Sequence, residues 1–503
     1  MNIDEARNMI DDIDTQILEL FLCRMELCAQ IFMQKAACGK NILDPAREEN
    51  ILSRVSEKSA DMASYSCRLF EEMLSLSREY QGTLTPLSEN PPKFGLLGEH
   101  LAHSFSPQIY EMLGIRNYKL IETTGDRLKD ILGDVGYSGL NVTMPFKRDV
   151  VPLCDELSYE VRETGCANTL VRRSDGRLCA YNTDLGGFIF AAKLAKLDFT
   201  DKRVLVFGSG GASLAAVAAS KRMGAASVTV VSRTGKVNYG NLDAYANSQI
   251  IINATPVGMF PGNLETIMSL ERFTCCEGVF DMVYNPRRTM LIMDAEARGI
   301  PATDGLPMLV YQALIAARLF LDVNIAEGEA LKILPKLRAQ CGNIIIVGMP
   351  GSGKTTIGKE IANVTDRRFI DIDDEIEKTA GKPVAQLFAE LGEEGFRQLE
   401  KQETILAGAQ TGCVIATGGG VVKSMQNYCP LRQNGRIYCL LRPMEKLALE
   451  GRPLSKDFDA LFQMRRERVP MYLDFADVAI GNNGTIPETA KLILEDYYEN
   501  IGN

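Results

Sequence analysis

The sequence predicts a multidomain protein in which one all-α segment is followed by two α/β segments. Three observations support this fold class. The chain has 503 residues, which corresponds to roughly three or four domains of ordinary size. Residues 1–81 repeat apolar side chains at intervals of three and four, as helices do, whereas the later residues alternate short β runs with helical patterns. The hydrophobic share of 46% and the charged share of 24% are those of a globular protein.

Composition also limits the classes of function. The 65 acidic and 55 basic residues leave a net charge of −10, which argues against nucleic acid or an anionic membrane as the main partner. We see neither the apolar core of a signal peptide nor a stretch long enough to span a bilayer. The 13 cysteines include no CxxC pair, so we expect reduced thiols and a cytoplasmic location. Only His100 and His103 are histidines, which excludes a His-rich metal site.

Changes in pattern give the domain boundaries. We expect a helical domain at 1–82, a linker with proline and serine at 83–92, one α/β domain at 93–338 and another at 343–503. Only a few residues connect the two α/β domains, so we expect these domains to pack closely. The strands that we predict are Phe94–Leu97, Gly139–Val142, Arg203–Phe207, Ser227–Val231, Ile250–Asn253, Gly278–Met282, Asn343–Val347 and Val414–Ala416.

The first helix is predicted from Ile3 to Ala37 and would be roughly 50 Å long. A domain of this size cannot cover such a helix, so we expect a dimer with exchanged packing. Arg24 falls where the apolar rhythm requires an apolar residue, and Lys35 follows on nearly the same face. A buried arginine needs an anionic partner, which is either a glutamate of a facing helix or a bound anion.

Over its whole length this domain resembles the all-α chorismate mutases, which implies rearrangement of chorismate to prephenate without a cofactor. Arginines suit the two carboxylates of the substrate, and a lysine and an amide suit the ether oxygen that gains charge. The resemblance also implies a homodimer in which Arg7 reaches into the site of the partner subunit. It assigns catalysis to Lys35, Glu48 and Gln81, and substrate binding to Arg7, Arg24, Asp44, Arg47 and Ser77.

A glycine-rich turn follows the strand predicted at Arg203–Phe207. In Gly208-Ser-Gly-Gly-Ala-Ser213 it opens a helix, which brings backbone amides and a helix N-terminus to a pyrophosphate. Alone, the motif does not distinguish dinucleotide binding from a tight βα turn. The next strand ends in Ser232-Arg233-Thr234, and an arginine at this place suits the 2′-phosphate of NADP better than the free ribose of NAD.

Polar clusters on both sides of this turn closely resemble those of shikimate dehydrogenase and cover nearly all of residues 93–338. They are His103-Ser-Phe-Ser-Pro107, Asn141-Val-Thr-Met-Pro-Phe-Lys147, Gly165-Cys-Ala-Asn-Thr169, Asn182-Thr-Asp184, Asn253-Ala-Thr-Pro256, Asp281-Met-Val-Tyr-Asn-Pro286 and Asp304-Gly-Leu-Pro-Met-Leu-Val-Tyr-Gln312. The resemblance implies a substrate part at 93–195 and 310–338 and a Rossmann-like NADP part at 196–309. Residues 235–249 are shorter than the helix and strand that this family commonly has there, so the NADP part is abbreviated.

The same resemblance implies NADPH-dependent reduction of 3-dehydroshikimate to shikimate. Lys147 and Asp184 would be the catalytic pair, because an ammonium group can protonate the developing alkoxide while a carboxylate holds it. Substrate binding is expected from Ser104, Ser106, Thr143, Asn168, Thr183, Tyr284 and Gln312. Cofactor binding is expected from Gly208, Gly210, Gly211, Ala212, Ser232, Arg233, Thr234 and Gly305.

The last domain carries a phosphate-binding loop. Gly348-Met-Pro-Gly-Ser-Gly-Lys354-Thr355 has the GxxxxGK[ST] pattern, follows the strand Asn343–Val347 and precedes a helix. In such a P-loop the backbone amides cradle the phosphates of ATP, the lysine reaches the β and γ groups, and the threonine binds Mg²⁺.

Residues 343–490 resemble shikimate kinase, which implies ATP-dependent phosphorylation of shikimate. Asp371 would place Mg²⁺ together with Thr355, and Lys354 and Asp373 would be catalytic. Side chains two apart on a strand share a face, so we expect Asp371 and Asp373 to face one cleft. Shikimate binding is expected from Arg397, Gly418, Gly419, Gly420 and Arg468, and nucleotide binding from Gly351, Ser352, Gly353, Thr355, Thr356 and Arg452 of a short lid.

Our leading interpretation is a trifunctional enzyme of aromatic biosynthesis with small-molecule substrates. Two other classes of function compete with it. The helical domain could be a regulatory sensor without turnover, but a sensor does not need Lys35 or Gln81 beside its arginines. The chain could also be a scaffold with degenerate catalytic units, but Lys147, Asp184 and Lys354 are all present.

Overall fold

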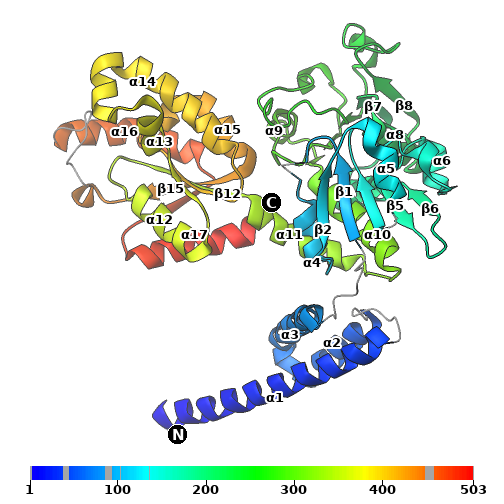
Figure 1. Ribbon diagram of the computed structural model, residues 1–503. Helices are drawn as coiled ribbons and strands as arrows, with labels where there is room; N and C mark the ends of the chain where they lie inside the picture. The colour runs from blue at the N-terminus through cyan, green and yellow to red at the C-terminus, as the bar shows by residue number, and fades with distance from the viewer. Residues whose placement is uncertain are drawn as a thin grey trace. The chain divides into compact units, whose positions relative to one another are not determined.

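The computed structural model describes residues 3–37, 45–84, 93–101, 104–134, 136–447 and 458–501 (Figure 1). The chain forms two compact units. The first consists of Met1–Val161, Cys166–Tyr181 and Ala313–Glu329, and the second of Arg162–Gly165, Asn182–Gln312 and Ala330–Asn503. No helix in these described stretches is long and apolar enough to cross a membrane.

The first unit begins with three helices. These are α1 (Ile3–Ala37), α2 (Pro45–Ser59) and α3 (Ala63–Leu84), with the 3₁₀ turn η1 (Ala60–Met62) before α3. The bounds predicted for the first helix are confirmed. Both α1 and α2 contact α3, and Phe32 and Leu74 are buried between helices.

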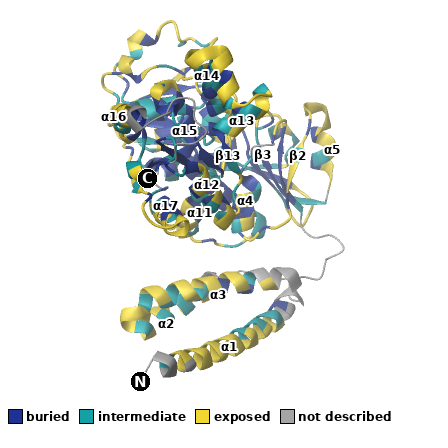
Figure 2. Cartoon of the chain, turned by 90° about the vertical axis from the view of Figure 1, so that its left-hand side faces the viewer, coloured by how far each residue is buried: buried dark blue, intermediate teal, exposed yellow. Residues whose placement is uncertain are grey.

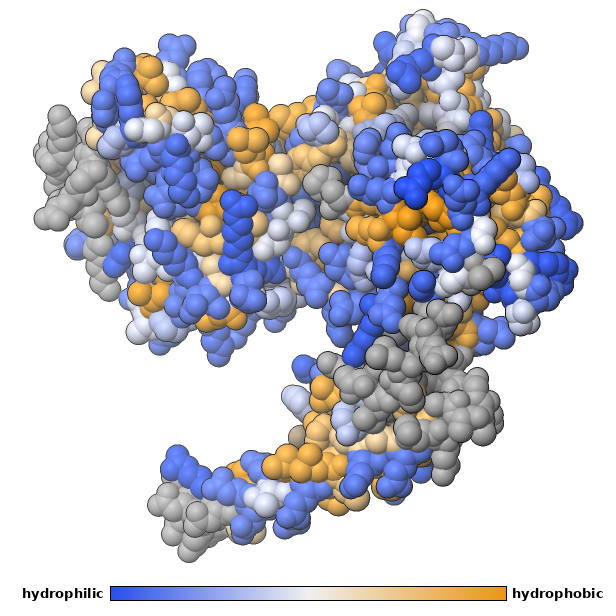
Figure 3. All heavy atoms as spheres, viewed as in Figure 1, coloured by the Kyte–Doolittle hydropathy of each residue, from blue (hydrophilic) through white to orange (hydrophobic). Residues whose placement is uncertain are grey.

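Most of the apolar face of α1 is uncovered, as Figure 2 shows by burial and Figure 3 by the hydrophobic side chains along this surface. The exposed fractions lie between 43% and 71% for Met9, Ile10, Ile13, Ile17, Leu18, Leu20, Leu22, Leu27 and Ile31. So large an exposed apolar surface is unusual on a monomer and is typical of a protein interface.

The rest of the first unit is built on a six-stranded sheet of order β2-β1-β3-β5-β6-β4. Strands β1 to β3 are parallel, and β5 is antiparallel to both of its neighbours. Gly139 is required in β3, because a Cβ there would lie 2.4 Å from the ring of Phe320. The elements are β1 (Lys93–Gly98), α4 (Ser106–Met112), β2 (Tyr118–Glu122), η2 (Gly125–Arg127), α5 (Leu128–Gly133), β3 (Tyr137–Val142), η3 (Val151–Leu153), β4 (Glu156–Leu157), α6 (Tyr159–Thr164), β5 (Thr169–Arg172) and β6 (Leu178–Tyr181).

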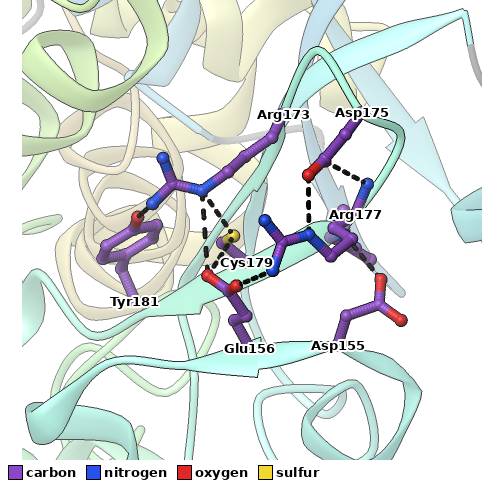
Figure 4. A network of polar contacts seen from close by, with 8 residues as sticks. Asp155, Glu156, Arg173, Asp175, Arg177, Cys179 and Tyr181 are labelled. Carbon is purple, nitrogen blue, oxygen red and sulfur yellow. Dashed lines mark hydrogen bonds and ion pairs between the residues drawn. The ribbon is translucent and has the colours of Figure 1, made fainter.

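The edge of this sheet is covered by a polar network (Figure 4). Glu156 of the short edge strand β4 pairs with Arg177, which also contacts Asp175 at 2.7 Å. Arg173 Nε lies 3.1 Å from Cys179 Sγ and 3.8 Å from Glu156. The charged side chains are about half exposed, so water screens them and each pair contributes about 0–1 kcal/mol. Their main effect is to place charge on an edge that could otherwise pair with another strand.

The first half of the second unit contains a parallel sheet of order β11-β10-β9-β7-β8. Alternate strand residues face two separate cores, since Val204 and Val206 pack with α7 and α8 while Leu205 and Phe207 pack with α9. The elements are α7 (Asp184–Leu194), β7 (Arg203–Phe207), α8 (Gly211–Arg222), β8 (Ser227–Val231), η4 (Leu242–Tyr245), β9 (Ile250–Asn253), η5 (Leu270–Arg272), β10 (Gly278–Asp281), α9 (Met290–Ala297), β11 (Ala302–Thr303) and α10 (Leu306–Leu321), whose residues from Ala313 on belong to the first unit. Three of these strands have the predicted bounds, and β8 is an edge strand.

The remainder of the second unit is a second parallel sheet, of order β13-β14-β12-β15-β16. Ile344 and Ile346 of β12 pack against α12 and α17, while Ile345 and Val347 face α13 to α16, so helices cover both faces. The elements are α11 (Gly328–Cys341), β12 (Asn343–Gly348), α12 (Lys354–Thr365), β13 (Phe369–Asp371), α13 (Ile372–Ala380), α14 (Val384–Gly408), β14 (Val414–Ala416), η6 (Val421–Lys423), η7 (Met425–Asn427), α15 (Tyr428–Asn434), β15 (Gly435–Leu441), η8 (Met444–Lys446), α16 (Phe458–Phe475), β16 (Val478–Gly481) and α17 (Ile486–Asn500). The fold class predicted from the sequence is confirmed.

Asp281, the last residue of β10, is a carboxyl group with 0% exposure. Its Oδ1 accepts hydrogen bonds from Asn253 Nδ2 (2.9 Å) and Val283 N (3.0 Å), and its Oδ2 accepts one from Thr289 Oγ1 (2.6 Å). Burial raises the pKa of Asp281 to about 7, because the loss of hydration outweighs these three hydrogen bonds.

This shift predicts a pH dependence of stability. The pKa of Asp281 is about 7 when folded and about 4 when unfolded, so the folded state binds more protons in between and stability falls as the pH rises across that window. Asp281→Asn cannot titrate. The free energy of unfolding of Asp281→Asn minus that of the wild type should therefore rise by on the order of 4 kcal/mol between pH 4 and pH 7. Denaturant unfolding followed by circular dichroism at several pH values measures this difference. A pH-independent difference between Asp281→Asn and the wild type would contradict the assignment.

Candidate functional site

The phosphate loop lies between β12 and α12, where the sequence predicts it. Gly348 (φ +148°) and Gly353 (φ +96°) adopt left-handed backbone conformations. A Cβ on Gly353 would lie 2.7 Å from Asn482 Nδ2, which donates a hydrogen bond to Ser352 O at 2.7 Å. Lys354 is 9% exposed and donates to the carbonyl oxygens of Gly348 (3.0 Å) and Met349 (3.1 Å). Gly351 lies in the same loop, and Thr356 is exposed in the first turn of α12.

The two aspartates lie beside this loop, but their placement on one strand was predicted wrongly. Strand β13 ends at Asp371, and Asp373 belongs to the first turn of α13. The reason is capping, because Asp371 Oδ1 accepts from the backbone N of Asp373 at 3.1 Å and starts the helix. Asp371 Oδ2 also accepts from Thr355 Oγ1 at 2.7 Å. Burial, and then the charge of Asp371, raise the pKa of Asp373 to about 6, while Lys354 opposes the shift.

Charged groups surround Asp373 from a second side. Arg397 of α14 donates to Glu400 at 2.7 Å, and Glu400 is 0% exposed. A Cβ on Gly418 would lie 2.7 Å from Asp373 Oδ1. A Cβ on Gly420 would lie 2.1 Å from both terminal nitrogens of Arg397. The glycines are therefore what lets the backbone approach these side chains.

Arg468 joins this group by donating to the carbonyl oxygen of Gly419 at 2.9 Å, which also accepts from Tyr472. Among the described residues, Arg397 Nε, Glu400 Oε1 and Arg468 Nε are buried without a hydrogen-bond partner. Buried polar atoms usually have a hydrogen-bond partner, so we expect a polar ligand to supply the partner of these three atoms. Sequence reasoning missed Glu400, although its place three residues after Arg397 on a helix was a usable signal. Arg452 lies outside the described residues.

The substrate part of the first α/β region holds a buried polar network. Asn141 Oδ1 accepts from Tyr110 (2.6 Å) and Tyr118 (2.7 Å), and Asn141 Nδ2 donates to Thr169 Oγ1 (3.0 Å). The two tyrosine rings stack at 4.0 Å, and burial raises the pKa of both hydroxyls. The sequence analysis missed both tyrosines. The predicted residues near this network are the buried Ser106 and Asn168, with Ser104, Thr143 and Lys147 partly exposed.

Other predicted dehydrogenase residues belong to the second unit. Thr183 Oγ1 donates to Gln312 Oε1 at 3.2 Å, and both side chains are buried. Asp184 is buried at the first position of α7. Burial raises the pKa of Tyr284 to about 12, and Gly305 approaches the Met282 carbonyl so closely that no Cβ would fit. Since Lys147 lies in the first unit, its pairing with Asp184 stays a prediction.

The glycine-rich turn after β7 brings the backbone of two loops close together. Gly208 has φ +117°, and a Cβ there would lie 2.7 Å from the carbonyl oxygen of Ala254. Helix α8 begins at Gly211, next to Gly210 and Ala212. After β8, Ser232 is followed by the exposed Arg233 and Thr234, and residues 235–249 form turns and η4 but no strand, as expected for an abbreviated cofactor part.

In the helical part, Arg24 donates to the hydroxyl of Ser77 and, at 3.4 Å, to the carbonyl oxygen of Met73. Among the described residues of this chain it has no carboxylate partner, so the structure does not give it the glutamate considered above. Glu48 instead pairs with Arg78 at 2.5 Å, a residue that sequence reasoning missed. Arg7 and Arg47 are exposed, the side chains of Lys35 and Gln81 are not among those described, and Asp44 lies outside the described residues.

The central region is similar to known shikimate dehydrogenases. It is 36% identical over 273 residues to shikimate dehydrogenase (NADP(+)) of Caldicellulosiruptor bescii. The aligned region covers 48% of this chain and 94% of that protein. The chain belongs to the shikimate dehydrogenase family. The enzyme of Chlorobaculum tepidum is also 36% identical, over 286 residues, with 49% of this chain and 94% of that protein covered.

The flanking regions of this shikimate dehydrogenase family member match two other families. The chorismate mutase type II model matches residues 6–82, the shikimate dehydrogenase substrate binding domain model residues 96–170, and the shikimate kinase model residues 350–498. A solved chorismate mutase/shikimate 5-dehydrogenase fusion protein from Clostridium acetobutylicum is 31% identical, with 49% of this chain and 97% of that chain covered and a TM-score of 0.47. The predicted succession of three families is confirmed.

The close approach of Gly420 to Arg397 gives a prediction for the kinase region. In Gly420→Ala the new Cβ would lie 2.1 Å from both terminal nitrogens of Arg397, so the guanidinium must move. We expect the KM for shikimate to rise by about tenfold or more while the KM for ATP changes by less than about twofold. Steady-state ADP release measures both constants. Gly328→Ala, where a Cβ would meet no atom within 4 Å, is the matched control. An unchanged KM for shikimate would show that Arg397 does not belong to the site that binds shikimate.

Proposed function

We propose that this chain is a trifunctional enzyme of the shikimate pathway. It would reduce 3-dehydroshikimate to shikimate with NADPH, phosphorylate the 3-hydroxyl of shikimate with ATP, and rearrange chorismate to prephenate. The observation that carries the proposal is that three family matches follow one another along one chain, each over residues that suit its reaction. We place the enzyme in the cytoplasm, where its cysteines would stay reduced.

In the kinase, the loop from Gly348 to Thr355 suits the phosphates of ATP, because its glycines open the backbone amides to a ligand. The oxygens of Thr355 and Asp371 lie 2.7 Å apart and are of the kind that Mg²⁺ prefers, so these two residues would hold the ion. Bound Mg²⁺ would neutralise charge on the β- and γ-phosphates. Lys354 would exchange its carbonyl partners for phosphate oxygens.

The acceptor side follows from the buried charges. Arg397 and Arg468 would bind the carboxylate of shikimate, and Glu400 would hold Arg397 in place through their 2.7 Å hydrogen bond. Asp373 would orient the 3-hydroxyl and accept its proton as that oxygen bonds to the γ-phosphorus and ADP leaves. Since phosphoryl transfer depends mostly on alignment, these positions matter more than any single contact.

In the dehydrogenase, the turn at Gly208 fits the pyrophosphate of NADP, and Arg233 is placed after β8 to meet its 2′-phosphate. NADPH would supply the hydride that reaches C3 of the substrate. Lys147 would donate a proton to the carbonyl oxygen as it becomes a hydroxyl, with Asp184 holding the ammonium group. Thr183 and Gln312, joined at 3.2 Å, would bind hydroxyl groups of the substrate.

In the mutase, Arg24 and Ser77 would bind a carboxylate together, since both lie on facing helices and Arg24 donates to no carboxylate among the described residues. Lys35 and Gln81 would donate to the ether oxygen. We propose a homodimer formed through α1, because its apolar side chains are exposed from Met9 to Ile31. Exposed Arg7, near the start of α1, would then reach the site of the second copy.

A substrate panel on the purified full-length protein tests the proposal. We expect NADPH oxidation with 3-dehydroshikimate, ADP release with shikimate, and loss of the absorbance of chorismate. Lys147→Ala should remove only the first activity and Lys354→Ala only the second, because each lysine serves one reaction. Absence of any activity from the wild type would overturn that part of the proposal, and loss of two activities in one variant would contradict the separate sites.

The mutase site gives a separate prediction. Arg24→Ala removes a guanidinium that would bind a substrate carboxylate, at a cost of roughly 2–5 kcal/mol in transition-state binding. Chorismate turnover should fall at least about a hundredfold while the other two activities persist. Arg54→Ala, at an exposed position of α2, is the control. If turnover in Arg24→Ala equals that of the control, Arg24 only supports the packing of α1 on α3.

A further inference from the structure

The second compact unit contains the NADP part of the dehydrogenase together with the kinase, and a buried polar boundary joins them. Its centre is a reciprocal pair of hydrogen bonds. Asn263 Nδ2 donates to Gln433 Oε1 at 2.6 Å, and Gln433 Nε2 donates to the carbonyl oxygen of Asn263 at 2.6 Å. Asn263 is 3% exposed and Gln433 is 0% exposed. Each side chain would leave unsatisfied polar atoms if the other were withdrawn.

A loop of the dehydrogenase is held by the same kinase helix. The backbone N of Arg287 donates to Asn434 Oδ1 at 3.0 Å, and Asn434 Nδ2 donates to Asn285 Oδ1 at 3.2 Å. The backbone N of Arg288 donates to the carbonyl oxygen of Gln433 at 2.9 Å. Three hydrogen-bonding groups of residues 285–288 are thus matched directly to α15, without long side chains that could reorient.

The charges on the two sides are complementary. Arg287 reaches the carbonyl oxygen of Ile501, at the end of α17, at 2.5 Å and lies 3.7 Å from Asp304. Burial lowers the pKa of Arg287 to about 9, and the neighbouring cations Arg288 and Arg338 act in the same direction. The C-terminal end of a helix carries partial negative charge, so α17 supplies what this group of arginines needs.

The connection between the two parts is also covered. Helix α11 ends two residues before β12, and its last turn has carbonyl oxygens that no intrahelical donor can satisfy. The Tyr497 hydroxyl lies within hydrogen-bond distance of the carbonyl oxygens of Ala339 (2.9 Å) and Gly342 (2.7 Å), and Arg367 donates to that of Gly342 at 2.7 Å. Arg367 and Tyr497 belong to the kinase, so the kinase caps the helix that leads into it.

We propose that α15 and the end of α17 form a docking surface of the kinase for the NADP part of the dehydrogenase, and that the two parts unfold as one. Its functional consequence lies in the loop 285–288, which directly follows Tyr284 of the proposed dehydrogenase site. On the kinase side, α15 follows the glycine run, and Asn427 donates to the carbonyl oxygen of Val421 at 2.9 Å between them. A ligand that stabilises the kinase therefore stabilises the dehydrogenase, by linkage.

The test uses the full-length chain and MgADP, a ligand for the kinase alone. Dehydrogenase activity is followed during heating, with and without MgADP. In the wild type we expect MgADP to slow the thermal inactivation of the dehydrogenase by about threefold or more. Asn263→Ala and Gln433→Ala should lose this protection, and the double variant should lose no more than either single one, since both remove the same contact. Gln402→Ala, exposed on α14, should keep the protection.

A second measurement does not depend on turnover. Calorimetry of the wild type should show one transition for the second unit, which separates into two in Asn434→Ala, a substitution at the rim of the boundary. The proposal is overturned if MgADP does not protect the wild-type dehydrogenase, if Gln433→Ala is protected as well as the wild type, or if the variants act additively. Absence of dehydrogenase activity in the unheated wild type would count against the proposed function, and calorimetry alone would then decide on the boundary.

Discussion

Both proposed nucleotide sites depend on one constraint, which is that all strands of a parallel sheet end at the same edge. In the kinase, β12 ends at the phosphate loop, β13 at Asp371 and β14 just before the glycine run, so three separate stretches of sequence meet there. In the dehydrogenase, β7 ends at Gly208 and its neighbour β9 at Asn253, which brings the Ala254 carbonyl against the glycine turn. Without the parallel pairing of the strands, each sequence motif would still be present, but the residues of each site would lie far apart.

The kinase also holds several charged side chains away from water. Glu400 and Arg468 are buried, and Asp373 and Arg397 are partly buried. A Cβ on Gly418 would clash with Asp373 and Glu400, and one on Gly420 with Arg397, so the glycines let the backbone pack against these charges. Such groups are costly to desolvate, and the cost is tolerable only when each charge meets an opposite one. Arg397 meets Glu400, but one buried polar atom each of Arg397, Glu400 and Arg468 stays without a protein partner among the described residues. The site is therefore stable enough to fold and still has hydrogen-bonding capacity left for an anionic substrate.

The parts of the chain differ in the kind of surface through which they associate. The NADP part and the kinase satisfy each other's buried amides, carbonyls and arginines, so their boundary is polar and specific. The helical part has an apolar face on α1 that its own small core, around Phe32 and Leu74, does not cover. A polar boundary selects one geometry because each donor needs its acceptor, whereas an apolar stripe selects a partner of complementary shape. This difference is the physical reason for proposing that one association lies within the chain and the other between two copies of it.

The sequence by itself determined the fold class, four of the five strands of the NADP part and the P-loop, because periodicity and glycine-rich turns are local properties. It also determined most of the candidate residues of the kinase, since each lies in a short motif. It could not determine that Asp371 caps α13 and moves Asp373 off the strand, nor that Arg24 meets Ser77 instead of a glutamate. Glu400, Arg78, Tyr110 and the Asn263–Gln433 pair also escaped, because each acquires its meaning from a residue distant in sequence or from burial. Tertiary structure alone decided these contacts, since only folding brings together side chains that no local pattern relates.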